Sequence, residues 1–309
     1  MILLDLSNPQ HQLLRERLQP YIDEATAPAT RKAYRTDLRH FQDWGGRLPA
    51  SPQVVADYLV YLAQTHKPAT LQRRLASISR AHSTLNLPNP VPSELVRLTM
   101  RGIRRKVGVA QRQVRPLMRD DLVSVVSQLG DTPRDLRDKA LLLIGFCGAF
   151  RRSELMALDM ADIEPTPQGL VITIRHSKTD QLGEGRKVGI PRGRVPNLCP
   201  LHALSSWVAM ANITSGPVFR AVGKGGHITS RRLAPKAVAA IVKERAAAVG
   251  LTATELSGHS LRAGLATSAA QAGMRPDKIK AQTGHASDTM LARYIRDGDI
   301  WRDNAGGLF

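Results

Sequence analysis

The first hundred residues alternate apolar and basic positions at helical spacing. Tyr34, Leu38 and Phe41 recur at intervals of 4 and 3, while most basic residues of 28–44 fall elsewhere, which predicts an amphipathic helix with a basic outer side. Three more helices are predicted from cap and proline signals at Ser51-Pro52, Pro68 and Ser93. The pattern therefore predicts an all-helical N-terminal domain.

The rest of the chain mixes helices with one short hairpin. Thr132-Pro133 predicts a helix start ahead of the apolar run Leu141 to Phe150. Residues 170–174 are rich in β-branched side chains, and residues 186–190 form a second short strand after a glycine-containing connection. Further helical segments are predicted near 200–211, 233–249, 259–272, 276–283 and 287–295. The expected fold class is mainly α with a small β-hairpin or sheet.

A basic stretch separates the two parts. Residues 97–115 contain no acidic residue, and their basic residues are Arg97, Arg101, Arg104, Arg105, Lys106, Arg112 and Arg115. A solvated charged run has the same composition, but residues 107–115 also lack apolar periodicity and precede Pro116, which favours a flexible basic connector. We predict a helical domain at 1–106, a basic linker at 107–116 and a second domain at 117–309.

The charge composition of the chain predicts a polyanionic partner. The 309 residues carry a formal net charge of +18 at pH 7, and both halves share the basic excess. Such a field attracts nucleic acid or an anionic membrane surface. No apolar stretch approaches the length of a membrane-spanning helix, and the N-terminus lacks the basic start of a signal peptide. We therefore expect a soluble cytoplasmic, nucleoid-associated protein and place DNA ahead of membrane.

The sequence offers no sign of a cofactor or a metal. Cys147 and Cys199 cannot form a disulfide framework and have no zinc-binding spacing, which is typical of a reducing compartment. The glycine-rich loops that bind nucleotides and the signatures of zinc and serine hydrolases are absent. We expect chemistry by side chains alone.

Two short segments of the second part contain a cation at a position that suggests a partner or a function. Arg151 follows a buried apolar helix, where a lone charge is costly unless an anion pairs with it, and Glu154 stands three residues later. Lys178 lies in the turn after a strand, where its long side chain can reach outward. Taken singly, the first is explained by a structural ion pair and the second by hairpin solubility.

Two further segments contain histidines. His259 and Arg262 are at i and i+3 of a predicted helix, so both side chains can point into one site. His285 follows a glycine and precedes Tyr294 by nine residues. A lone histidine is more often a satisfied core residue than a functional one, but the order and spacing of all four segments favour a shared function.

In this order and spacing, the segments resemble the tyrosine recombinase, or phage integrase, family of Cre-like and Xer-like site-specific recombinases. The family positions are matched by Arg151 and Glu154 in R-x-S-E-L, Lys178 in the hairpin turn, His259 and Arg262 in H-x-x-R, and His285 and Tyr294 as G-H and nucleophile. The resemblance covers the whole second half. It extends more weakly to residues 30–38, which look like the opening of the family's helical, SAM-like core-binding domain.

The resemblance implies a site-specific DNA recombinase that works through a 3′-phosphotyrosyl intermediate, for integration, excision or resolution, without metal or ATP. Tyr294 is then the nucleophile, and the two arginines hold the non-bridging phosphate oxygens. His259 is the candidate base for the phenol, and Lys178 the candidate acid for the leaving 5′-hydroxyl. His285 is expected to donate a hydrogen bond to the phosphate, and Glu154 to orient the basic groups.

The resemblance also implies an assembly. The two domains are expected to close around a DNA duplex as a C-shaped clamp, in a homotetramer on recombination sites, without the additional arm-binding domain of some relatives. The tail at 300–309 is expected to dock on a neighbouring protomer, with packing on its own domain as the alternative. The residues expected to contact DNA are Arg31, Lys32, Arg35, Arg73, Arg74, Arg101, Arg104, Arg105 and Lys106.

Two other functions remain open at this point. A type IB topoisomerase-like or telomere-resolving enzyme uses similar chemistry without the same exchange of partners. A basic helical regulator occupies DNA sites without cutting them, and its activity would survive the loss of the Tyr294 hydroxyl.

Overall fold

The chain divides into two compact units, residues 1–112 and 113–309. The computed structural model describes residues 17, 21, 25–109, 114–177, 180, 184–285, 287–289, 291–292 and 294. Each unit has a hydrophobic core of its own. No helix in these described ranges is both long enough and apolar enough to cross a membrane.

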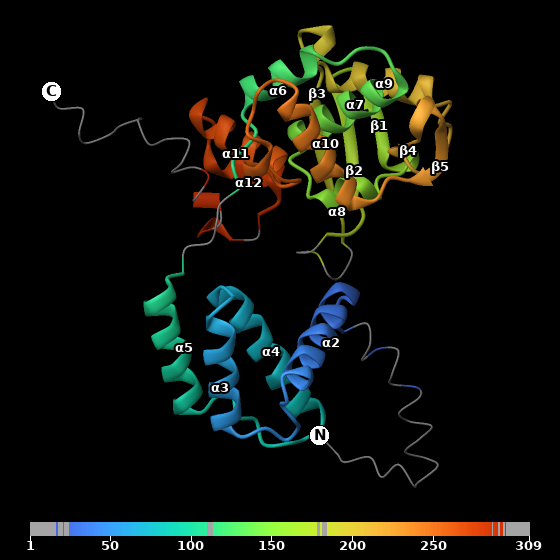
Figure 1. Cartoon of the computed structure of the whole chain (residues 1–309). Coiled ribbons are helices and arrows are strands. Elements are labelled where there is room, and N and C mark those ends of the chain that lie inside the picture. The colour runs from blue at the N-terminus through green and yellow to red at the C-terminus, as the bar shows by residue number, and fades with distance from the viewer. Residues whose placement is uncertain are drawn as a thin grey trace, which may run out of the picture. The chain divides into compact units, whose positions relative to one another are not determined.

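Unit 1 is helical, as the sequence predicts (Figure 1). Its helices in the described part of the chain are α2 (Pro28–Asp43), α3 (Pro52–Ala63), α4 (Pro68–Thr84) and α5 (Glu94–Val107). The predicted cap at Ser51 is confirmed, because its side chain accepts a hydrogen bond from the backbone N–H of Val54 at 3.3 Å. Phe41, Tyr58 and Leu59 are fully buried where these helices meet.

The helix predicted to start at Ser93 is present as α5, and it includes the first part of the basic stretch. Helix α5 continues through Val107, and its arginines lie on the outer side. Val96, Met100 and Ile103, at spacings of 4 and 3, are buried against the other helices of unit 1. This narrow apolar stripe is sufficient to hold a strongly basic helix against unit 1.

Unit 2 combines helices with two small antiparallel sheets. Its helices in the described ranges are α6 (Arg119–Ser127), α7 (Pro133–Cys147), α8 (Arg152–Ala157), α9 (Pro200–Met210), α10 (Pro235–Ala247), α11 (Ser260–Gln271) and α12 (Pro276–Thr283). Its strands there are β1 (Ile163–Thr166), β2 (Gly169–Ile174), β3 (Arg186–Pro191), β4 (Arg220–Val222) and β5 (Ile228–Arg232). Short 3₁₀ turns lie at 160–162, 196–198, 224–226 and 253–255.

The predicted hairpin is confirmed as β2 and β3, paired from Gly169 opposite Pro191 to Ile174 opposite Arg186. The structure adds β1 on the other side of β2, and a separate β4–β5 pair. Strand β1 is an edge strand of sequence Ile-Glu-Pro-Thr, too short and too polar to be recognised from its pattern.

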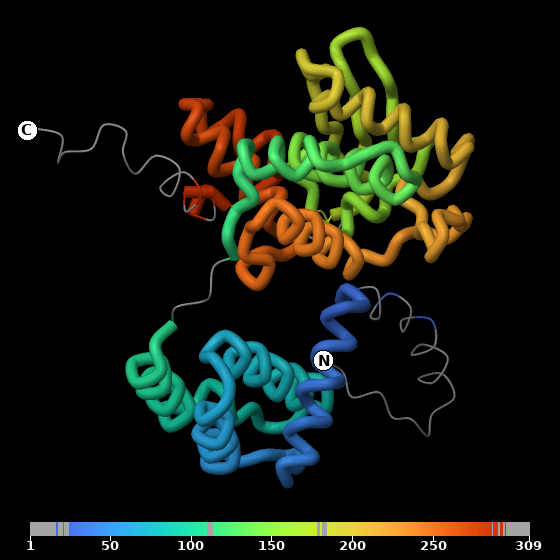
Figure 2. The backbone as a smooth tube through the Cα atoms, turned by 45° about the horizontal axis from the view of Figure 1, so that its top comes forward, coloured from blue at the N-terminus to red at the C-terminus, as the bar shows by residue number. Residues whose placement is uncertain are grey.

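Helix α7 is the centre of the second core. Leu141, Leu142 and Ile144 are fully buried, and α9 packs along α7. Helix α11 also packs on α7, and both views show α11 and α12 side by side, in orange-red and red (Figures 1 and 2). Close contact is possible because a Cβ atom on Gly145 of α7 would come within 2.9 Å of Leu155 and of Leu261. Helices α7, α8 and α11 therefore converge at the end of α7.

Candidate active site

The turn after α7 presents the first predicted arginine. Ala149 has a left-handed backbone with a φ of 49°, an uncommon conformation for a residue with a Cβ atom. Arg151 is the N-cap residue of α8, and its backbone N–H donates to Glu154 Oε2 at 3.0 Å. Its Nη1 donates to Glu154 Oε1 at 2.5 Å, and the Glu154 side chain is 1% exposed. The predicted pairing of these two residues is thus present in a buried setting.

Arg262 of α11 approaches the same place from another helix. Its Nη1 donates to the carbonyl oxygen of Ala149 at 2.9 Å, whereas its buried Nη2 has no hydrogen-bond partner among the described residues. Burial, followed by the charge of Arg151, lowers the pKa of Arg262 to about 10, so the guanidinium remains charged at neutral pH. A buried cation with an unused donor is suited to bind an anion.

Arg186 is a third arginine here, and the sequence analysis missed it. Its Nη1 donates to the carbonyl oxygen of Gln282 at 3.2 Å, and its Nη2 lies 3.7 Å from Glu154 Oε2. Burial lowers its pKa. The sequence contained a signal for Arg186. Side chains alternate along a strand, and Arg186 is on the same side as the buried Val188 and Ile190. A charged residue in the inward register of a strand indicates a special site.

Three guanidinium groups therefore surround one carboxylate. The described groups that interact electrostatically with Arg262 include Arg151, Arg186, Glu154 and Tyr294. With one carboxylate against three arginines, the cluster keeps an excess of positive charge in a partly buried place. Such a site is complementary to a group that carries or develops negative charge on several oxygens, such as a phosphodiester.

His285 lies directly after α12, where Gly284 ends the helix with a left-handed φ of 63°. Arg151 Nη2 donates to the carbonyl oxygen of Gly284 at 3.3 Å, which ties this turn to the arginine cluster. The His285 ring stacks on Tyr294 with ring centroids 5.6 Å apart. Burial, and then the charges of the three arginines, lower the pKa of His285 to about 4, so the ring is neutral at neutral pH.

The other two predicted catalytic residues, His259 and Lys178, are not among the described members of the buried arginine cluster. His259 is the N-cap residue of α11 and is exposed, whereas Arg262 on the next turn is buried. The backbone N–H of His259 donates to Ser257 Oγ at 3.1 Å. Lys178 lies outside the described residues, as do Arg293, Arg296 and the tail at 300–309.

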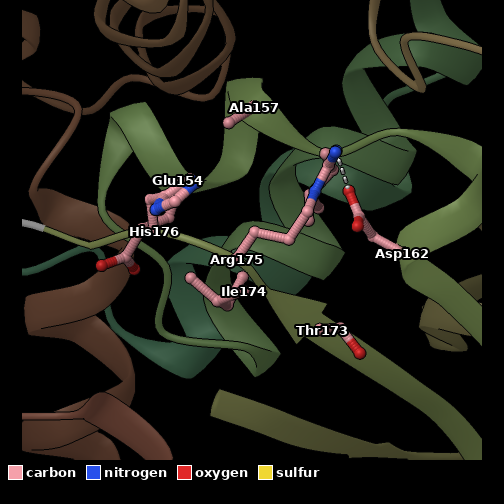
Figure 3. Close-up of a pocket in the computed structure, with 8 residues that line it drawn as sticks. Glu154, Ala157, Asp162, Thr173, Ile174, Arg175 and His176 are labelled. Carbon is pink, nitrogen blue, oxygen red and sulfur yellow. Dashed lines mark hydrogen bonds and ion pairs between the residues drawn. The ribbon is translucent and has the colours of Figure 1, made fainter. Parts of the chain in front are cut away.

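A small cavity lies where β2 ends and the connection to β3 begins. It is lined by Glu154, Ala157, Leu158, Asp162, Thr173, Ile174, Arg175 and His176 (Figure 3). Figure 3 shows Arg175 reaching to Asp162, and its Nη2 lies 2.7 Å from Asp162 and 2.8 Å from Asp159. The hydrogen bonds from Arg175 lower the pKa of Asp159. These pairs fix Arg175, which directly follows β2 and stands three residues before Lys178 in the sequence.

The residues predicted to contact DNA in unit 1 divide into two groups. Those that are exposed are Lys32, Arg35, Arg73, Arg101, Arg104, Arg105 and Lys106, and Arg31 is half-buried. Arg74 differs, since it is 8% exposed and its Nη1 contacts His40 Nδ1 at 2.9 Å and Tyr58 Oη at 3.1 Å. This arginine is part of a polar network inside the unit, so we leave it out of the DNA-contacting surface.

Comparisons with known proteins point to one family. The phage integrase family matches residues 115–299, a range that includes every predicted catalytic position. An integrase/recombinase xerD homolog of Selenomonas ruminantium is 40% identical over 294 residues, covering 92% of this chain and 86% of that protein. Recombinase cre of Escherichia phage P1 is 28% identical over 271 residues, covering 81% and 77%.

Solved structures show the same fold at low identity. A lambda integrase dimer bound to a core site has a TM-score of 0.64 at 17% identity and covers 93% of this chain and 95% of that one. The Tn1549 transposon integrase in complex with transposon right end DNA has a TM-score of 0.63 at 17% identity, covering 92% and 93%. The length and identity of the family match establish that this chain belongs to the phage integrase family of tyrosine recombinases.

Proposed function

We propose that the chain is a site-specific recombinase that cleaves and rejoins DNA strands through a 3′-phosphotyrosyl bond to Tyr294. The observation that carries the proposal is the cluster of three arginines and Glu154 beside the stacked His285 and Tyr294. This arrangement pairs an anion-binding pocket with a nucleophile.

Arg151 and Arg262 hold the non-bridging oxygens of the scissile phosphate. Attack by the phenol adds negative charge to these oxygens, and a buried guanidinium stabilises that charge more than the original diester. Lys178, which follows β2 in the sequence, protonates the leaving 5′-hydroxyl. The new bond conserves the energy of the phosphodiester, so another 5′-hydroxyl reverses the step without ATP.

DNA is the partner, and the exposed basic residues of α2 and α5 supply phosphate contacts in unit 1. The xerD homolog and cre are recombinases by name, and a lambda integrase tetramer has been solved on a Holliday junction. By analogy we infer a homotetramer that joins two sites, with the tail at 300–309 docked on a neighbouring protomer. Action on the chromosome places the protein at the nucleoid.

A suicide-substrate assay tests the proposal. The full chain is incubated in EDTA with nicked duplexes drawn from the DNA that flanks its coding sequence, and a covalent protein–DNA band is sought on a denaturing gel. We expect a band that Tyr294→Phe abolishes. Tight binding without a band on any duplex favours a DNA-binding regulator, and relaxation of any supercoiled plasmid by a monomer favours a topoisomerase-like enzyme.

A further inference from the structure

Each of the three guanidinium groups in the arginine cluster donates a hydrogen bond to a backbone carbonyl oxygen. The pairs are Arg262 with Ala149, Arg186 with Gln282, and Arg151 with Gly284. Two of the three acceptors, at Gln282 and Gly284, lie at the C-terminal end of α12. The position of this helix end therefore decides where two of the three guanidinium groups point.

The side-chain amide of Gln282 fixes the end of α12 against two other segments. Its Nε2 donates to the carbonyl oxygen of Cys147 at 2.7 Å and to that of Gly189 at 3.0 Å. A carbonyl oxygen only accepts hydrogen bonds, so the amide must present its NH₂ group, and not its oxygen, to these partners. The NH₂ group has two protons, one for each bond. Gln282 thus uses both of its side-chain donors on backbone carbonyl oxygens.

The first of these bonds reaches the end of α7. Carbonyl oxygens in the last turn of a helix lack partners within the helix. Those of 144–146 accept from backbone N–H groups of the turn that follows α7, and that of Cys147 accepts from Gln282. Arg151 follows Cys147 by four residues. The bond therefore ties α12 to the turn that places the first arginine.

The second bond reaches β3, which in the described ranges has a strand on one side only. The carbonyl groups on the other edge of such a strand need different partners. Gly189 of β3 accepts from the Gln282 side chain, and Arg186 of the same strand donates to the Gln282 backbone carbonyl at 3.2 Å. Two bonds that start three residues apart on β3 fix the distance and the rotation of the end of α12 relative to the strand.

We propose that Gln282 is a positioning residue of the arginine cluster. Its amide joins the ends of α7 and α12 to β3, and so holds Arg151 and Arg186 in the arrangement that receives the scissile phosphate. The inference rests on the proposed function and deepens it, because it adds an uncharged residue to the residues on which cleavage depends. Gln282 donates both side-chain N–H groups to the protein, so it acts through the arginines and not on the DNA.

A purely structural role of Gln282 predicts a different result. A loss of stability lowers the fraction of folded protein, but the folded protein bound to DNA then cleaves at the normal rate. A displaced arginine cluster leaves DNA affinity unchanged, because the exposed basic residues supply those contacts, and slows the chemical step. The rate of cleavage within the saturated complex therefore separates the two roles.

Single-turnover cleavage of the nicked duplex, with the full chain at saturating concentration, measures that rate. Gln282→Met keeps an unbranched side chain of similar length without donors, and we expect it to cleave about 100-fold more slowly with unchanged DNA affinity. Gln282→Asn keeps both donors on a side chain that is one methylene shorter, and its rate should be intermediate.

Trp207→Phe is the matched control. The Nε1 group of the fully buried Trp207 on α9 donates to the Val218 carbonyl oxygen at 2.8 Å, a bond of the same kind that no residue of the arginine cluster shares. We expect this variant to unfold at a lower urea concentration than the wild type, yet to cleave at the wild-type rate when it is folded and bound.

Proton exchange of the Gln282 amide tests the contacts without any reaction. The full chain is labelled with side-chain ¹⁵N glutamine, and the Gln282 signals are identified by their loss in Gln282→Asn. We expect both amide protons of Gln282 to exchange with water more slowly than those of Gln53, which is exposed on α3.

Three results would overturn the proposal. The first is a wild-type rate of cleavage in Gln282→Met or, if that variant does not fold, in Gln282→Asn. The second is an equal loss of rate in Gln282→Met and Trp207→Phe, which reduces the role to stability. The third is exchange of the Gln282 amide protons as fast as those of Gln53.

The proposal and the recombinase function can fail separately. If the wild type forms no covalent band on any duplex, the recombinase function fails and the role of Gln282 in cleavage fails with it. Exchange of the Gln282 amide still decides in that case whether the contacts with Cys147 and Gly189 exist, so the two failures are distinguishable.

Discussion

Arg262 and Ala149, which are 113 positions apart in the chain, are joined by a hydrogen bond of 2.9 Å from the guanidinium to the carbonyl oxygen. The left-handed turn at Ala149 aims that carbonyl at α11. One guanidinium nitrogen is thereby fixed, while Nη2 is buried without a partner among the described residues. The bond explains how a flexible side chain is held ready for a phosphate oxygen.

Replacing Arg262 by lysine should therefore reduce catalysis although the charge remains. An ammonium group cannot contact the Ala149 carbonyl and a phosphate oxygen with the geometry of a planar fork. We expect formation of the covalent band to fall by about 100- to 1000-fold, as for loss of one preorganised donor, with little change in DNA binding. Arg231→Lys, at an exposed arginine of β5, is the control and should behave as the wild type.

The lowered pKa of His285 predicts a dependence of stability on pH. Between pH 6.5 and about 4, the unfolded chain binds a proton at this ring that the folded chain does not. The free energy of unfolding should therefore decrease as the pH falls through this window, with the full contribution present above pH 6.5. A shift from 6.5 to about 4 corresponds to roughly 3 kcal/mol.

Hydrogen exchange of the α7 amides reports on unit 2 alone and measures this effect. In His285→Phe, which keeps an aromatic ring, protection should decline less steeply with falling pH than in the wild type. His202→Gln, at an exposed histidine of α9, should retain the wild-type slope. Equal slopes in the wild type and His285→Phe would contradict the assignment.

Gly284→Ala should damage the site beyond its cost in stability. A left-handed residue with a Cβ atom costs about 1–2 kcal/mol. At Gly284 the Cβ atom would also lie 2.9 Å from the Arg186 guanidinium, and the shift would move His285. Gly250→Ala is the control, with a φ of 82° and nothing within 4 Å of its Cβ position. Both variants should lose similar stability, but only Gly284→Ala should lose most of its covalent product.

Arg35 and Arg74 should separate DNA binding from stability. Arg74→Ala removes the arginine that contacts the buried Tyr58 hydroxyl and His40, while the buried Asp37 keeps Arg73 at 2.7 Å, and loss of such a buried partner costs about 1–3 kcal/mol. Arg35 is exposed, so Arg35→Ala should change stability by about 0.5 kcal/mol at most.

Chemical denaturation and DNA titration at several salt concentrations distinguish the two variants. Arg35→Ala should weaken DNA binding uniformly and reduce the salt slope by about 1. If Arg74→Ala is as stable as Arg35→Ala, the buried network does not carry the stability inferred for it.

The sequence by itself determined the local elements and indicated the candidate catalytic residues. Serine, threonine and proline caps specify helix starts such as Ser51 and Thr132 through contacts within one turn, so the pattern predicts them directly. The hairpin could be predicted for the same reason, because its two strands are close together in the sequence. The order of Arg151, Lys178, His259, Arg262, His285 and Tyr294 was sufficient to indicate the family and its chemistry.

Only the tertiary structure decided which cations face inward. Arg73 and Arg74 are adjacent and alike in sequence, yet one is exposed and the other is buried. Arg186 joins the arginine cluster at Glu154, and Thr283 Oγ1 lies 2.8 Å from His285 Nδ1. The burial of a charge depends on partners from distant segments, such as the carbonyl of Gln282 for Arg186, and no local pattern records them. Sequence spacing therefore identified candidate reactive groups, whereas non-local packing decided which charged side chains are buried.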